Sequence, residues 1–281
     1  MRRKKQIGNI AFHVICILFA LTSLYPILWM ISSSLKESSQ VFVDAANLIP
    51  HEFKIENYIN GWRGFGGISF AYFFKNTFIV VILSVLGVVV TCPFVAYGFA
   101  RLDFPFKNVC FMTILISLML PGQVVMIPQY IMFNKLGWLN TYLPFWVPAL
   151  LATTPFHIFM VYQFLRGLPI ELDEAAGMDG CGPVRVLTGI LLPLLKPVIF
   201  SVAVFQFIWN WNDFFNVFIM ISGVDRYTVS LGLRMMLDTD AASAWNQILA
   251  MSVVSLIPCT LFYLSMQKYF VEGISTTGLK G

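Results

Sequence analysis

The chain has 281 residues, of which 58% are hydrophobic and 11% are charged, and its mean hydropathy is +0.77. This composition is far too apolar for a soluble domain, so the sequence predicts an all-α integral membrane protein. The net charge of +4 is modest and spread along the chain, which argues against a nucleic-acid partner.

The first predicted element is a membrane span at residues 10–33. Four basic residues, at positions 2–5, precede an apolar run. The run is longer than the hydrophobic core of a signal peptide and no A-x-A cleavage site follows it, so we expect a retained span. Because basic residues favour the cytoplasmic side of a membrane helix, residues 1–9 are expected in the cytoplasm.

Residues 34–75 form a polar segment that contains one proline and several glycines. The segment is long enough for a small folded flap outside the membrane, and we interpret it as an extracytoplasmic loop. Its sequence holds no catalytic grouping.

Five further spans are predicted within residues 76–269, the core of the protein. Each is close to the 20 residues that cross the hydrocarbon, and together with the first span they make six. Of the 18 Lys and Arg residues, 11 fall in segments that this topology places inside and 7 outside. This bias favours cytoplasmic termini, including a C-terminal tail at 270–281. The five spans are expected at 76–100, 109–133, 142–165, 197–221 and 248–269.

Polar side chains concentrate in the fifth predicted span, in the run FQFIWNWNDFFN. Polar groups are costly in hydrocarbon and normally face a bundle interior or a water-filled cavity. Amides beside aromatic rings suit a sugar, and Trp211 and Trp209 are candidates for stacking on its ring. The alternative is that these side chains join helices to one another. The candidates for a substrate path are Gln123, Gln206, Asn210, Trp211, Asn212 and Asp213.

Prolines interrupt the third predicted span, at Pro121 beside Gly122 and again at Pro128. A broken helix at membrane depth is tolerated where it lines a cavity, but a simple proline kink explains the pattern equally well. On the fourth span, His157 and Gln163 are further candidates. A lone histidine there is more often a packed residue than a ligand.

The loop at 166–196 is charged and rich in small residues, unlike the apolar runs around it. Pro169 suits the first position of a helix, and the three acids that follow complement the positive end of its dipole. Gly180 suits a C-terminal cap with positive φ, and Pro183 suits the start of a second helix. The loop therefore predicts two short helices with a bend between them.

The loop contains a spaced motif, which reads EAA, three residues, G, nine residues, I, one residue and LP. This motif resembles the EAA loop of permease subunits of ABC importers. The resemblance implies a cytoplasmic coupling helix that docks into a separate ATPase subunit. Gly182 replaces the small polar residue often found before the second arm. The alternative is an amphipathic helix on the bilayer surface. The residues that match the motif are Glu174, Ala175, Ala176, Gly180, Ile190, Leu192 and Pro193.

The resemblance covers most of residues 70–281 and is closest to the second, shorter permease of maltose-type carbohydrate importers. It rests also on LMLPGQ at 118–123, on the stretch 127–142, on WNDF at 211–214 and on the tail from 268. It implies a type I ABC importer fold and a C-terminal tail that contacts the ATPase through Gly273, Lys280 and Gly281. Without the resemblance, a frayed end explains the tail equally well.

The same resemblance implies the partners of the chain. They are a second permease in a heterodimer, two cytoplasmic ATPase subunits that bind ATP and Mg²⁺, an extracytoplasmic solute-binding protein, a carbohydrate and membrane lipid. The location implied is the cytoplasmic membrane of a bacterium or archaeon, crossed several times.

No chemistry of its own is evident in the chain. It lacks a G-x-x-x-x-G-K-[ST] phosphate loop, a Ser/His/Asp grouping and metal-ligand spacing, and its five cysteines show no CxxC pairing. We therefore expect no enzyme, no metal and no cofactor in this chain. The alternative to an importer subunit is a self-contained secondary transporter or channel, but such proteins usually carry paired intramembrane charges or an internal repeat.

Overall fold

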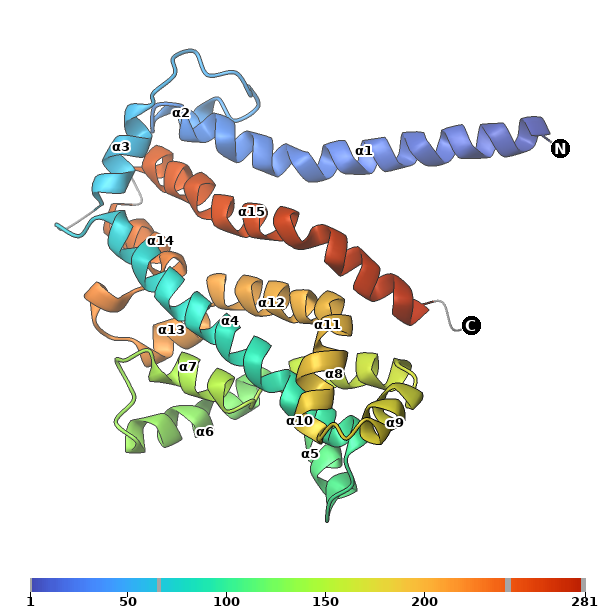
Figure 1. Cartoon of the computed structure of the whole chain (residues 1–281). Coiled ribbons are helices and arrows are strands. Elements are labelled where there is room, and N and C mark those ends of the chain that lie inside the picture. Colours follow the sequence, from blue (N-terminus) through green and yellow to red (C-terminus); the bar gives the residue numbers. More distant parts are fainter. Residues whose placement is uncertain (1, 65–66, 241–243, 279–281) are drawn as a thin grey trace. The chain divides into compact units, whose positions relative to one another are not determined.

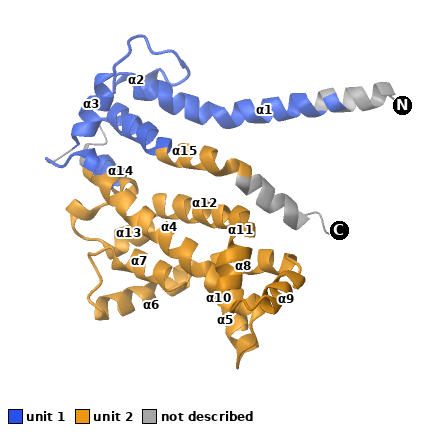
Figure 2. Cartoon of the chain, in the orientation of Figure 1, with its two compact units in different colours: residues 1–71, 232–257 blue, residues 72–231, 258–281 orange. Residues whose placement is uncertain are grey.

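A computed structural model describes residues 2–64, 67–240 and 244–278, and within these residues every regular element is helical (Figure 1). The chain divides into two compact units (Figure 2). Unit 1 comprises Met1–Ala71 and Gly232–Ile257, and unit 2 comprises Tyr72–Leu231 and Pro258–Gly281.

Long apolar helices confirm the prediction of an all-α membrane protein. Four stretches are long and apolar enough to cross a membrane: Phe12–Ser34, Phe70–Arg101, Leu143–Gly167 and Trp245–Lys268. Two bent helix pairs also qualify, and counting each pair as one crossing gives the predicted six. The long helices are α1 (Arg2–Ser34), α4 (Phe70–Arg101), α7 (Leu143–Leu150) with α8 (Pro155–Gly167), and α15 (Trp245–Gly278).

The third predicted span is a bent pair and not one helix. The chain direction bends by 109° between helix α5 (Lys107–Met119) and helix α6 (Gly122–Lys135). Leu120 adopts an extended conformation because a residue that precedes proline is driven away from the α region. Of the two predicted interruptions, only Pro121 interrupts the helix, since Pro128 lies within α6.

The fifth predicted span is also broken. Helix α12 (Lys196–Trp211) ends before residues 212–214, and helix α13 (Phe215–Met220) follows. Asn210 and Asp213 were both predicted within this span, but they do not lie on one helix, because only Asn210 lies in α12 and Asp213 lies in the break.

The predicted flap is a small fold inside unit 1, with helices α2 (Gln40–Val43) and α3 (Glu56–Arg63). Lys36 is its centre: the ammonium group is buried and donates to the carbonyls of Asp44 at 2.7 Å and Asn47 at 2.6 Å. The side chain of Asn57 donates to the carbonyls of Ser34 and Lys36. The flap ends earlier than predicted, because α4 already begins at Phe70.

In unit 2, helix α4 packs closely against α7 through a stripe of small residues. The backbone of Ala149 and Leu150 lies 3.0 Å from where a Cβ on Gly87 would be. Ser84 donates to the carbonyl of Phe145 at 3.0 Å, and Thr91 donates to that of Ala149 at 3.1 Å. Small and hydroxylated residues are the usual means by which membrane helices approach this closely.

Helix α15 continues to Gly278, beyond the predicted end of the sixth span at 269, so Gly273 lies in a helix. Lys280 and Gly281, the other two residues of the predicted tail contact, lie outside the described residues. Between α13 and α15 the chain forms η2 (Val224–Arg226) and α14 (Val229–Asp240).

Candidate functional site

The first candidate site is the EAA loop, residues 171–193. Its first arm is helix α9 (Glu171–Met178), with Glu171, Asp173 and Glu174 in the first turn as predicted. The helix begins two residues after Pro169, with Ile170 at the N-cap position, so Pro169 does not occupy the first helical position.

The bend of the EAA loop is a Schellman motif centred on Gly180. The N–H of Gly180 donates to the carbonyl of Gly177 and that of Cys181 donates to the carbonyl of Ala176, both at 3.0 Å. Gly180 has φ +78°, which confirms the predicted cap. Only glycine adopts this conformation without steric cost.

The second arm of the loop is less regular than predicted. It consists of α10 (Pro183–Arg185), a π-helical turn η1 (Val186–Leu191) and α11 (Leu192–Leu194). Pro183 opens this arm, as the sequence predicted. The arm then bends by 79° into α12, which makes the second bent pair.

One face of the EAA loop is anchored in the core of unit 2. The buried side chains of Ala176, Leu187 and Leu191 belong to a hydrophobic cluster that also contains residues of α4, α8 and α12. Movement of the loop therefore has a direct route into three helices of the bundle, because close-packed interiors transmit displacement.

A buried ion pair adds to this anchor. Nε of Arg101, at the end of α4, lies 3.0 Å from Oδ2 of Asp173 in α9, and their side chains are 6% and 15% exposed. Nη2 of Arg101 also donates to the carbonyl of Leu168 at 2.9 Å, just before α9. Sequence reasoning missed this pair because the two residues are far apart in the chain.

The other face of the loop is open. Glu174, Ala175 and Gly180 are exposed, together with the apolar side chains of Met178 and Val184. Small and apolar groups on an exposed turn allow a second surface to approach closely. Of the remaining motif residues Ala176 is buried, Ile190 and Leu192 are half-buried, and Pro193 is exposed.

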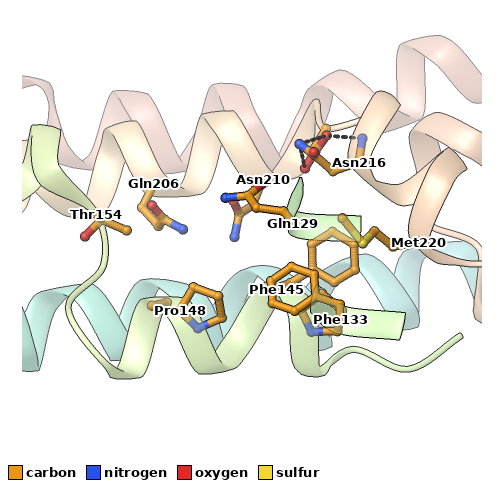
Figure 3. A pocket seen from close by; sticks show the side chains of 12 residues that line it. Gln129, Phe133, Phe145, Pro148, Thr154, Gln206, Asn210, Asn216 and Met220 are labelled. Atoms are coloured by element: carbon orange, nitrogen blue, oxygen red, sulfur yellow. Dashed lines mark hydrogen bonds between the residues drawn. The ribbon is translucent and has the colours of Figure 1, made fainter. Parts of the chain in front are cut away.

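The second candidate site is a cavity of about 190 Å³ in unit 2, here called the polar pocket (Figure 3). Helices α6 and α7 line it on one side, and α12, α13 and the break between them line the other. Its lining residues are Gln129, Phe133, Pro144, Phe145, Pro148, Ala149, Thr154, Gln206, Asn210, Asp213, Asn216 and Met220.

Two amides in the pocket are available for a ligand. Gln206 is only 7% exposed, and its side chain forms no hydrogen bond within the part of the chain that the structure describes. The side-chain amide of Asn210, one turn later in α12, is likewise without a hydrogen-bond partner among those residues. Figure 3 shows both amides directed into the space above Pro148 and Phe145. Gln206 is buried and Asn210 is half-buried, and both amides line the cavity with their hydrogen-bonding capacity unused, so these groups are suited to a polar ligand.

The structure brings together three of the predicted path residues, Gln206, Asn210 and Asp213, despite the break in the span. It does not bring Gln123, Trp211 or Asn212 to this pocket. Gln123 is exposed, and the amide of Asn212 donates to the carbonyl of Ile208.

The tryptophans of the fifth span pack elsewhere, so the expected stacking surfaces differ. Trp211 is buried and stacks on Phe207, with ring centroids 5.5 Å apart. Trp209 packs against Phe156 and against His157, which is buried as a packed residue. Gln163 is exposed on α8. Aromatic faces in the pocket come from Phe133 and Phe145 instead.

Sequence reasoning missed the pocket residues Gln129, Thr154 and Asn216. Asn216 lies three residues after Asp213 in the same polar run, so extending the run to its end finds it. No local signal marks Gln129 or Thr154, which come from other helices.

Residues 85–276 match the family described as "Binding-protein-dependent transport system inner membrane component". The chain is 32% identical over 280 residues to YurM of Bacillus subtilis, a probable ABC transporter permease protein, covering 100% of this chain and 91% of YurM. It is 30% identical over 282 residues to UgpE of Brucella abortus, a permease protein of sn-glycerol-3-phosphate transport, covering 99% of each.

A third relative is AraQ of Halalkalibacterium halodurans, a permease protein of arabinooligosaccharide transport. It is 30% identical over 264 residues, which are 93% of each chain. Among solved structures, a chain of a bacterial ABC transporter for import of the acidic polysaccharide alginate superposes with a TM-score of 0.80. The superposition covers 95% of this chain and 98% of that chain at 22% identity, and it confirms the fold.

Proposed function

Because the chain belongs to the family of binding-protein-dependent transport system inner membrane components, we propose that it is the permease subunit of an ATP-driven carbohydrate importer. As a permease subunit it is a membrane protein with several spans and is not itself an enzyme. The single observation that carries the coupling role is the EAA loop, whose one face is fixed in the helix bundle and whose other face is open.

In the complete transporter this chain pairs with a second permease, two ATPase subunits on the cytoplasmic side and an external solute-binding protein. Both termini lie in the cytoplasm. ATP and Mg²⁺ bind to the ATPase subunits, and this chain holds no cofactor. These details rest on the resemblance and on the distribution of basic residues.

Coupling proceeds through the open face of the EAA loop. Closure of the ATPase subunits pushes α9, and the buried side chains beneath it pass the movement to α4, α8 and α12. The bundle then rocks between outward-open and inward-open states, which is alternating access by rigid-body motion.

The polar pocket contributes to the sugar path. Its amides donate to and accept from hydroxyl groups, and Phe133 and Phe145 cover the apolar face of a sugar ring. Its volume of about 190 Å³ is below the usual range of ligand pockets, roughly 300–1,000 Å³, so it holds part of an oligosaccharide at a time.

Glu174→Lys tests the coupling role. The charge reversal places a cation on the open face of the EAA loop and in the first turn of α9, where the helix dipole disfavours it. We expect the variant to insert into the membrane and to co-purify with the second permease, but to lose solute-stimulated ATP hydrolysis. Pull-down from native membranes and ATPase assays in proteoliposomes measure both properties.

The matched control for this variant is Asp103→Lys, which reverses a fully exposed acid outside the EAA loop. It should retain uptake, because exposed ion pairs contribute little. Recovery of the native chain without any ATPase or second permease, or normal uptake by Glu174→Lys, contradicts the proposal.

Gln206→Leu tests the polar pocket. Leucine keeps most of the volume of the side chain but removes the hydrogen bonds that the amide makes to the bound sugar in this proposal, each worth about 0.5–1.5 kcal/mol net. We expect sugar uptake to fall by up to about tenfold while basal ATP hydrolysis by the complex is unchanged. Gln163→Leu makes the same replacement at an exposed position of α8 and should leave uptake normal. Equal uptake by both variants removes the pocket from the sugar path.

A further inference from the structure

We infer that the polar pocket selects for uncharged sugars and excludes anionic groups such as phosphate esters and carboxylates, with Asp213 as the specificity-determining residue. This inference rests on the proposed function of the pocket as part of the sugar path. It concerns the charge of the substrate, which the family alone leaves open because its members are named for substrates of both kinds.

The first observation is the charge inventory of the pocket. Among its lining residues Asp213 is the one that carries a charge, and Lys, Arg and His are absent from them. The other polar groups are neutral: the amides of Gln129, Gln206, Asn210 and Asn216, and the hydroxyl of Thr154.

The second observation is that neutral groups alone hold the Asp213 carboxylate. The backbone N–H of Asn216 donates to Oδ1 at 3.1 Å, and Nδ2 of Asn216 donates to Oδ1 at 3.1 Å and to Oδ2 at 3.0 Å. No ion pair of Asp213 occurs among the described residues. Both carboxylate oxygens therefore accept hydrogen bonds from Asn216, a neutral residue, and no cation offsets their charge within the described ranges.

The backbone around Asp213 is also fixed. Ser230 donates to the carbonyl of Asp213 at 2.9 Å. Asp213 therefore presents its carboxylate to the pocket from a constrained position at the break between α12 and α13, where Figure 3 shows the hydrogen bonds to Asn216.

An anionic group that enters this pocket loses hydration and meets a like charge without a cation to compensate. A neutral hydroxyl group is not repelled by the carboxylate. It can donate to the free lone pairs of the carboxylate and accept from the amides of Gln206 and Asn210. The pocket thus discriminates by charge while offering the hydrogen bonds that a neutral sugar needs.

The test measures the charge preference of the pocket without requiring the identity of the sugar. In the complete transporter, with the five native cysteines replaced, Asn210→Cys places a thiol in the pocket. Its rate of modification is measured with two thiosulfonate reagents of similar size, a trimethylammonium cation and a sulfonate anion. The ratio of the two rates is divided by the ratio for a small thiol in solution.

We expect the cation to react at least about tenfold faster than the anion in the Asn210→Cys protein, because the interaction energy of charges a few ångströms apart in protein is large. In the double variant with Asp213→Asn, which keeps the shape and replaces the charge, the normalised ratio should return close to one. Equal rates, a ratio that Asp213→Asn does not change, or no reaction with either reagent overturns the inference.

This result is separable from failure of the proposed function. Loss of co-purifying ATPase, or normal coupling in Glu174→Lys, refutes the importer assignment without affecting the rate ratio. Conversely, a ratio near one in a transporter that is coupled as proposed refutes only the charge selection.

Discussion

Replacing Arg101 with Met is expected to destabilise the attachment of the EAA loop by about 3–5 kcal/mol and to abolish uptake. Methionine replaces the aliphatic part of the arginine but leaves the carboxylate of Asp173 buried without a counter-charge. The 3.0 Å ion pair and the hydrogen bond to the carbonyl of Leu168 are both lost. The open face of α9 is then no longer held in one orientation relative to α4.

Uptake in proteoliposomes and thermal unfolding of the purified complex measure this effect. Lys107→Met is the matched control, because Lys107 pairs at 3.2 Å with a fully exposed partner, Asp103. An exposed pair is worth at most about 1 kcal/mol, so this control should behave almost like the native protein.

A second comparison separates burial of an unpaired charge from simple loss of an interaction. Removing both partners, with Arg101→Met and Asp173→Leu together, leaves no uncompensated buried charge and should restore much of the stability. If Arg101→Met is as mild as Lys107→Met, or if the double variant is no more stable than the single one, the ion pair does not anchor the EAA loop.

The sequence predicted the features that depend on local or nearly local patterns. Apolar runs of sufficient length identify the membrane spans, and the spacing of acids, glycine and proline predicts α9, the cap at Gly180 and the start at Pro183. These signals act within a few residues, so the fold around them does not alter them. The polar run from Gln206 to Asp213 also indicated a cavity, because polar groups within an apolar span normally face the bundle interior or a water-filled space.

The features that the sequence did not predict depend on contacts between distant residues. A hydropathy profile does not detect the break between α12 and α13 at residues 212–214. This break changes which side chains line the pocket, because Asp213 lines it and Trp211 does not. Gln129 and Thr154 join the pocket from other helices, as Arg101 joins Asp173 from α4. In each case the partner is set by helix packing, which a single sequence does not display.

Replacing Gly180 with Pro is expected to abolish uptake while leaving the protein in the membrane. Gly180 has φ +78°, whereas the proline ring fixes φ near −65°, so the bend between the two arms of the EAA loop cannot form. Proline also removes the N–H that donates to the carbonyl of Gly177 at 3.0 Å. The combined cost is about 3 kcal/mol or more. Gly180 itself lies outside the candidate membrane spans, which is why insertion should be normal.

Alanine at two glycines of the same loop shows whether the backbone conformation is the cause. A Cβ at Gly180 or at Gly189 meets no atom within 4 Å, so neither replacement creates a clash. Gly180→Ala must hold a left-handed conformation, at about 1–2 kcal/mol, and should reduce uptake partially. Gly189 does not have a positive φ and lies in a helical turn, so Gly189→Ala should transport normally.

The expected order of uptake rates is therefore native and Gly189→Ala first, then Gly180→Ala, then Gly180→Pro. ATP hydrolysis should follow the same order when solute and binding protein are supplied, because a displaced α9 no longer presents Glu174, Ala175 and Met178 together. Native uptake by Gly180→Pro would falsify the role of the EAA loop as a lever. Equal losses in the two alanine variants would instead assign the sensitivity to bulk on the loop surface, and the backbone conformation of Gly180 would not be the cause.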